Sequence, residues 1–202
     1  MRYGAKKPEF NNPLKRLDVS GLSFLMSPPE DSSDKTTLEL ELLENIGRRL
    51  NLEDSENIQM YENNVLEQYT HVLDQFFLKY DRNELEEIIE DLILISEKEK
   101  EKHKRLRPKS LGKRQGYNIN EEYSAQTESY SYPSSHSTQS MFLSLYLAEQ
   151  YPIYKNVFTE LNNRISNSRL LSSNNYPTDN LAGQTLASVL YNKYMKEKKN
   201  EH

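Results

Sequence analysis

Three short segments of the chain carry the kinds of side chain that bind an oxyanion. Guanidinium groups bind phosphate oxygens in bidentate geometry and an ammonium group adds a point charge; the cations that could do so are Lys100, Arg107 and Arg169. Ser134 and Ser135 stand just before an amphipathic run, and the backbone N–H groups at such a helix start point at an anion. His136, at the same start, could donate a proton to a leaving group. Together these residues predict a cradle for a tetrahedral oxyanion.

Each part taken alone has a plainer structural interpretation. Lys100 lies in a charged run with Lys98, Lys102, Lys104 and Arg105, which by itself is typical of a solvated helix end. A single histidine at a helix start is more often an ordinary surface residue. The prediction therefore depends on the order and spacing of the whole set.

That order and spacing resemble the three signatures of the type-2 phosphatidic acid phosphatase and vanadium haloperoxidase superfamily, Lys-x6-Arg-Pro, Pro-Ser-Gly-His and Ser-Arg-x5-His-x3-Asp. Lys100 with Arg107-Pro108 matches the first signature, and residues 133–136 match the second, with Ser135 where glycine is commoner. Ser168-Arg169 and Asp179 match the third. The resemblance covers roughly residues 85–195 and implies an all-helical phosphatase-type core.

The third signature departs from the family at one position. The family carries its nucleophilic histidine where this chain has Asn175, and the resemblance gives Asp179 the role of orienting that residue. An amide nitrogen is not nucleophilic because its lone pair is delocalised into the carbonyl, so Asn175 should not form a phosphoryl intermediate. The chain has 4 histidines, and those outside the signatures, His71, His103 and His202, do not occupy the nucleophile's place.

The resemblance implies a soluble, metal-independent phosphatase-family protein acting on a small phosphate monoester, a nucleotide being one candidate, by a phosphohistidine-type mechanism. His136 would be the general acid and base, while Lys100, Arg107, Ser134, Ser135 and Arg169 would hold the phosphate. Asn175, whether engineered to trap a substrate or native, predicts little or no turnover. The alternative is a non-catalytic protein that binds or sequesters a phosphorylated metabolite or nucleotide. A helical interaction module with a vestigial site and a vanadium haloperoxidase are weaker interpretations.

Composition limits the partners and cofactors of such a site. The chain has 202 residues, a formal net charge of −5 and no cysteine, so disulfides, iron–sulfur clusters, thiolate zinc sites and cysteine nucleophiles are excluded. We expect no cofactor and no metal. A small phosphorylated ligand or phosphate is the expected partner, whereas net acidity argues against nucleic acid. No apolar stretch approaches the roughly 20 residues of a membrane span, and residues 1–12 lack a signal-peptide core, so a cytoplasmic location is expected.

The elements that must position these residues are predicted to be helices. Only 6 glycines and many Leu, Glu, Lys and Asn favour an all-α bundle. Apolar periodicity predicts helices over 37–50, 55–80, 83–105, 136–150, 152–167 and 179–198, with a long loop over 109–132 whose tyrosines could stack on a ligand ring or pack the loop down. Residues 1–35 are expected to form an arm or linker, and residues 36–202 one domain. The oligomeric state is left open.

Overall fold

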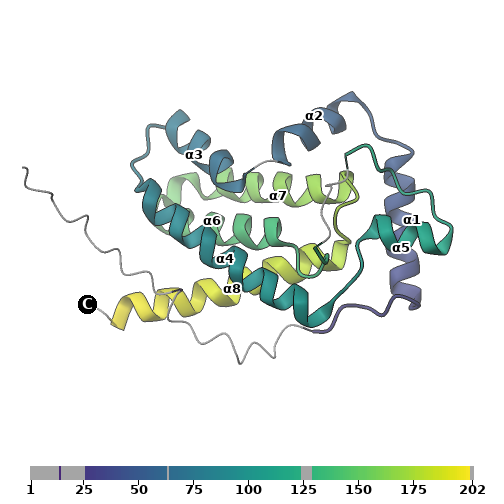
Figure 1. The fold of residues 1–202 in the computed structure, drawn as a ribbon. Coiled ribbons are helices and arrows are strands. Elements are labelled where there is room, and N and C mark those ends of the chain that lie inside the picture. The colour runs from purple at the N-terminus through teal and green to yellow at the C-terminus, as the bar shows by residue number, and fades with distance from the viewer. Residues whose placement is uncertain (1–13, 15–25, 63, 124–128, 201–202) are drawn as a thin grey trace, which may run out of the picture.

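The computed structural model describes residues 14, 26–62, 64–123 and 129–200. Within these residues every regular element is a helix, which confirms the predicted all-α class (Figure 1). The elements are α1 (Asp34–Gly47), α2 (Leu52–Tyr61), α3 (Val65–Gln75), α4 (Arg82–His103), α5 (Pro108–Gln115), α6 (Ser135–Gln150), a 3-10 turn η2 (Pro152–Tyr154), α7 (Lys155–Leu171) and α8 (Pro177–Asn200). Among the described helices, none combines the length and the apolar character needed to cross a membrane.

Helix α6 lies in the middle of the bundle (Figure 1). Its most extensive contacts are with α7 and α8, and it also contacts α4 and α3. Phe142, Leu143 and Leu147 of α6 are fully buried, and the ring of Phe142 meets that of Tyr194 on α8 edge-on with centroids 5.7 Å apart. Burying such side chains stabilises a fold by about 1.5–3 kcal/mol each. The start of α6, with Ser134–His136, is therefore fixed by the main core.

A second, smaller core lies at one end of the bundle, where α1 and α5 pack (Figure 1). Its buried members are Leu40, Leu43, Leu111, Ile119 and Tyr176. Because Tyr176 belongs to the segment of the third signature, this core ties α1 to the residues around Asn175 and Asp179.

The prediction of one helix over 55–80 is wrong. α2 ends at Tyr61 and α3 begins at Val65, and the Asn64 side chain caps α3 by accepting a hydrogen bond from the Leu66 N–H at 2.9 Å. Asparagine is a strong N-cap residue. The apolar stripe continues in phase across the break, so periodicity alone could not reveal it. The break places Glu62 at the end of α2.

The loop predicted over 109–132 begins with a helix instead. Pro108 starts α5, where its missing N–H costs nothing, and Gly116 ends it with φ 84° in the left-handed region. The predicted helix over 152–167 is split into η2 and α7, and α7 continues to Leu171 and so includes Arg169. The remaining helices differ from the predictions mainly at their ends, where assignments are least certain.

Most of the predicted arm 1–35 lies outside the described residues, as do residues 124–128 of the tyrosine-rich loop. Three of the four tyrosines that the structure places in this loop are engaged with the protein. Tyr132 is buried and its hydroxyl donates to the carbonyl of Met26, and the Tyr123 hydroxyl donates to Ser55 Oγ at 3.0 Å. Tyr117 packs against the second core. These contacts favour packing over ligand stacking.

Candidate active site

Lys100 lies in the last turn of α4, and it does not belong to a solvated helix end. It is only 5% exposed, and its Nζ is 2.6 Å from Glu97 Oε1, while its neighbours Lys102 and Lys104 are exposed. Burial lowers the pKa of Lys100, the charges of Arg107 and Arg169 lower it further, and Glu97 opposes both. The lysine therefore lies within the field of the other two predicted phosphate-binding cations.

Arg107 caps α5 and joins two backbone segments of the site. Its Nε donates to the carbonyl of Ser129 at 2.8 Å, its Nη2 to Ser129 Oγ at 2.9 Å, and its Nη1 to the carbonyl of Asn174 at 2.8 Å. Burial lowers the pKa of Arg107 to about 10, and the positive charge of Arg169 contributes. The guanidinium groups of Arg107 and Arg169 thus lie close enough to repel each other. A bound anion would reduce this repulsion.

The start of α6 presents backbone N–H donors beside the two serine hydroxyls, whose oxygens act as acceptors within the helix. Ser134 is the N-cap, and its Oγ accepts from the Ser137 N–H at 3.3 Å, while Ser135 Oγ accepts from Gln139 Nε2 at 3.0 Å. The N–H of Ser134 donates to the carbonyl of Asp179 at 3.0 Å. The first N–H groups of a helix have no acceptor within it, so those of Ser135 and His136 are the donors that this turn presents.

Gly183 allows this helix start to lie directly against α8. A Cβ atom at position 183 would be 2.4 Å from the carbonyl oxygen of Ser134. Only a residue without a side chain fits that distance, and the close contact brings the second signature against the third.

His136 lies where the charges of the site converge. Its Nε2 is 3.3 Å from the carbonyl oxygen of Glu62. Burial lowers the pKa of His136 to about 3, and the charges of Arg169, Lys100 and Arg107 add to the effect. These effects favour the neutral imidazole in the ligand-free protein, and an anion beside the cations would favour its protonated form.

We expect the His136 ring to remain neutral at about pH 5 and its pKa to rise when inorganic phosphate is added. Protonating the ring beside three cations is unfavourable, and a bound phosphate anion offsets part of their charge. NMR titration of the ring protons with and without phosphate measures this, and His136→Gln assigns the resonance. An ordinary titration near pH 6.5 without phosphate would contradict the arrangement.

Arg169 and Asn175 bring the third signature to the same place. Arg169 is 3% exposed, its Nη1 is 2.9 Å from Glu62 Oε2, and its Nε is buried without a hydrogen-bond acceptor among the described residues. The backbone N–H of Asn175 donates to the carbonyl of Arg169 at 3.2 Å. Asn175 Nδ2 donates to the carbonyl of Ser131 at 2.8 Å and lies 3.4 Å from Asp179 Oδ2. The structure thus gathers the residues of all three signatures at one site.

Comparison with known proteins addresses the fold. No protein-family model matches the chain, and no curated protein matches it by sequence at a significant level. Among solved structures it is similar to the crystal structure of the first transmembrane PAP2-type phosphatidylglycerolphosphate phosphatase from Bacillus subtilis, with a TM-score of 0.58 and 14% sequence identity over 84% of this chain and 89% of that one. The chain has the PAP2 fold. The function of its site has to be argued from the residues themselves.

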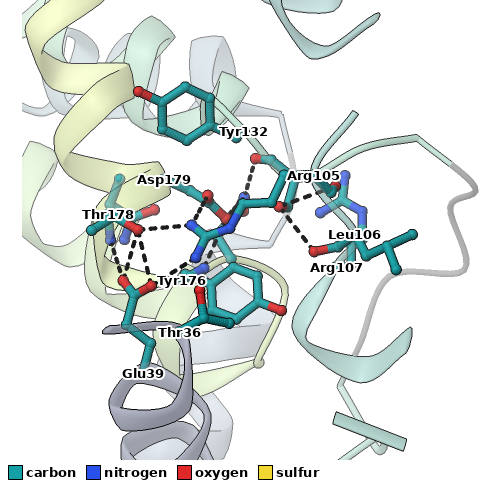
Figure 2. Close-up of polar contacts among 12 residues, drawn as sticks. Thr36, Glu39, Arg105, Leu106, Arg107, Tyr132, Tyr176, Thr178 and Asp179 are labelled. Carbon is teal, nitrogen blue, oxygen red and sulfur yellow. Dashed lines mark hydrogen bonds and ion pairs between the residues drawn. The ribbon is translucent and has the colours of Figure 1, made fainter. Parts of the chain in front are cut away.

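Within this PAP2 fold the structure shows a buried ionic network that the sequence prediction missed (Figure 2). Arg105 Nη1 donates to Asp179 Oδ1 and to Thr178 Oγ1, each at 2.7 Å, and its Nη2 donates to Glu39 Oε2 at 2.7 Å. The guanidinium carbon lies 3.8 Å from the centroid of the Tyr176 ring. Complete burial raises the pKa of Asp179, and the charge of Arg105 opposes the rise.

The network fixes the carboxylate that neighbours Asn175. Asp179 Oδ2 also accepts from the backbone N–H of Tyr176 at 2.9 Å, so both of its oxygens are engaged. Glu39 reaches the same segment from α1, where its Oε1 accepts from the N–H of Thr178 at 2.8 Å. In the sequence Arg105 is one residue of the charged run that includes Lys102 and Lys104, and nothing there marks it as part of the site. No local pattern marks Glu39, because its partners lie far away in the sequence.

Proposed function

We propose that this chain is a phosphatase-family protein of the PAP2 fold whose site holds the phosphate of a small phosphate monoester and is disabled for turnover by Asn175. The observation that carries the proposal is the convergence of Lys100, Arg107 and Arg169, from separate elements, next to His136. Burying like charges together is costly unless an anion compensates them. A tetrahedral dianion meets that requirement.

The chemistry of such a site needs no metal. The three cations would stabilise the equatorial oxygens of the phosphoryl group, with the N–H groups that open α6 as further donors. His136, once protonated in the presence of the anion, would donate its proton to the leaving oxygen and then activate water. The missing part is a nucleophile, since Asn175 carries none. We propose a soluble, cytoplasmic, acid-phosphatase-like protein whose ligand is small and phosphorylated.

A second candidate is a protein that binds a phosphorylated metabolite or nucleotide and never hydrolyses it. The contacts of Asn175 favour this alternative, because its amide nitrogen is held by Ser131 and lies beside Asp179 as a regular part of the structure. Both candidates share the anion site. They differ in whether a histidine at position 175 restores turnover.

The anion site is tested by Arg169→Ala. We expect the unchanged chain to bind inorganic phosphate in calorimetry and the variant to lose at least about tenfold in affinity, since a hydrogen bond to a charged group contributes roughly 1.5–3 kcal/mol. Arg164→Ala is the matched control, because Arg164 lies on the same helix α7 but pairs with Glu160 in solvent. Equal affinities for all three proteins, or no phosphate binding by the unchanged chain, would contradict the proposal.

A further inference from the structure

Glu62 lies outside the three signatures, at the end of α2, and its side chain contacts the candidate site. It follows Tyr61, the last residue of α2, and its backbone is the C-cap of that helix. It precedes the stretch 85–195 that carries the family resemblance, so nothing in the signatures assigns it a role.

The side chain of Glu62 contacts groups that we expect to bind the ligand. The Glu62 carboxylate is 2.9 Å from Arg169 Nη1 and accepts from Asn174 Nδ2 at 3.1 and 3.4 Å. The carbonyl of the same residue is 3.3 Å from His136 Nε2. Glu62 therefore contacts residues of the second and third signatures at once.

These contacts are those that a phosphate would make. Two oxygens of one anionic group, paired with a guanidinium group and an amide N–H, reproduce one edge of a phosphoryl group. The carboxylate does not satisfy the site completely, because Arg169 Nε remains without an acceptor among the described residues. A tetrahedral anion, with more oxygens, can engage more of the donors than a planar carboxylate does.

The cations of the site still disfavour one another with Glu62 in place. Lys100 pairs with Glu97 and Arg169 with Glu62, while the carboxylate of Asp179, which also acts on Arg107, is already paired with Arg105. The pKa of Arg107 is lowered to about 10 by burial and by Arg169, although Asp179, Glu97 and Glu62 oppose the effect. A dianion in place of the single charge of Glu62 would bring more negative charge to these cations.

The two members of the ion pair differ in their freedom to separate. The Arg169 side chain is 4% exposed, whereas the Glu62 side chain is 27% exposed and stands at a helix end. Moving the arginine would strand a charge in the interior, but the carboxylate can turn into water at little electrostatic cost. If another anion binds to Arg169, we therefore expect the Glu62 side chain to move and the Arg169 side chain to stay in place.

We propose that Glu62 is an intramolecular competitor for the ligand, whose carboxylate occupies the oxyanion position at Arg169 until a phosphate displaces it. This inference rests on the proposed function, because it assumes that the cations bind phosphate. It makes Glu62 a determinant of affinity and selectivity: a phosphate dianion carries enough charge to displace the carboxylate, and a monoanion of similar size does not.

The test is Glu62→Gln, which removes the charge and keeps an oxygen that can accept from Asn174. We expect calorimetry to show inorganic phosphate binding to the variant at least about tenfold more tightly, equivalent to about 1.4 kcal/mol. Phosphate should also raise the melting temperature of the variant more than that of the unchanged chain. Glu67→Gln is the matched control, because Glu67 pairs with Arg82 on the exposed surface, and it should bind phosphate as the unchanged chain does.

The possible outcomes separate this inference from the proposed function. If the unchanged chain binds phosphate and Arg169→Ala abolishes binding, but Glu62→Gln binds no more tightly, Glu62 is only a structural partner of Arg169 and the inference is wrong. If no variant binds phosphate, the proposed function and this inference both fail. Glu62→Ala, which also removes the hydrogen bond from Asn174, should shift the affinity in the same direction as Glu62→Gln, and a loss of affinity in both would overturn the proposal.

Discussion

Asn175→His should hydrolyse p-nitrophenyl phosphate at least about a hundredfold faster than the unchanged chain, because loss of the nucleophile from a covalent mechanism costs several orders of magnitude in rate. The proposed site already gathers the other residues to which we assign a role in the reaction. We therefore expect this one substitution to raise the rate of hydrolysis without any rearrangement of the cations around position 175.

The hydrogen bonds of Asn175 show how a histidine would be held. Its Nδ2 donates to the carbonyl of Ser131 at 2.8 Å and lies 3.4 Å from Asp179 Oδ2. In histidine, Nδ1 takes the corresponding place on the side chain, so the same acceptors would hold the Nδ1–H tautomer. That tautomer carries its lone pair on Nε2, as a nucleophile requires.

The restored reaction would proceed in two steps. Nε2 of the introduced histidine would attack phosphorus, forming a nitrogen–phosphorus bond as the ester oxygen leaves with a proton from His136. Water, deprotonated by His136, would then attack the phosphohistidine and release phosphate. A rapid acid-free quench followed by mass spectrometry should detect the phosphorylated residue 175.

Asn174→His is the matched control, since it makes the same chemical change at the neighbouring buried position and should give no activity. Thermal unfolding establishes that both variants fold, because a larger side chain at a buried site typically costs about 1–3 kcal/mol. A folded Asn175→His protein that neither hydrolyses a panel of phosphate monoesters nor becomes phosphorylated would exclude the disabled-enzyme interpretation. The binding-protein alternative would then be favoured.

The signature residues could be proposed from the sequence because the spacing within each signature is local. Lys100 and Arg107 are separated by one helix end, and residues 134–136 form a single turn, so the intervals within each signature are short enough for the whole set to be compared with the pattern of a family. The all-α class follows from composition in the same way. The long-range partners carry no such signal.

Glu39, Arg105 and Glu62 show why the remainder was not predicted. Arg105 lies among exposed lysines in the sequence, and only the left-handed backbone of Lys104, with φ 51°, ends α4 before it. Glu39 meets Arg105 across 66 residues, and Glu62 meets Asn174 across 112. A carboxylate on a helix is ordinarily solvated, so its burial against a distant arginine can be known only from the fold.

Arg105→Ala should destabilise the protein by about 3–5 kcal/mol, because removing one member of a buried ionic network leaves the others uncompensated. Asp179 and Glu39 would both lose the partner that lies 2.7 Å from each of them. Urea denaturation at neutral pH measures the free energy of unfolding. Arg48→Ala is the matched control; Arg48 pairs with Glu44 but its side chain is 60% exposed, so its loss should cost less than about 1 kcal/mol.

The pH dependence distinguishes an electrostatic cause from lost packing. Burial already raises the pKa of Asp179 in the folded protein, and without the charge of Arg105 the pKa should rise further. Between the unfolded and folded pKa values the folded state then binds more protons than the unfolded state, so the stability of the variant falls as the pH rises. The deficit of Arg105→Ala should be smaller at about pH 5 than at pH 8. A deficit that is independent of pH, or no larger than that of Arg48→Ala, would show that Arg105 contributes through packing alone and that Asp179 does not depend on its charge.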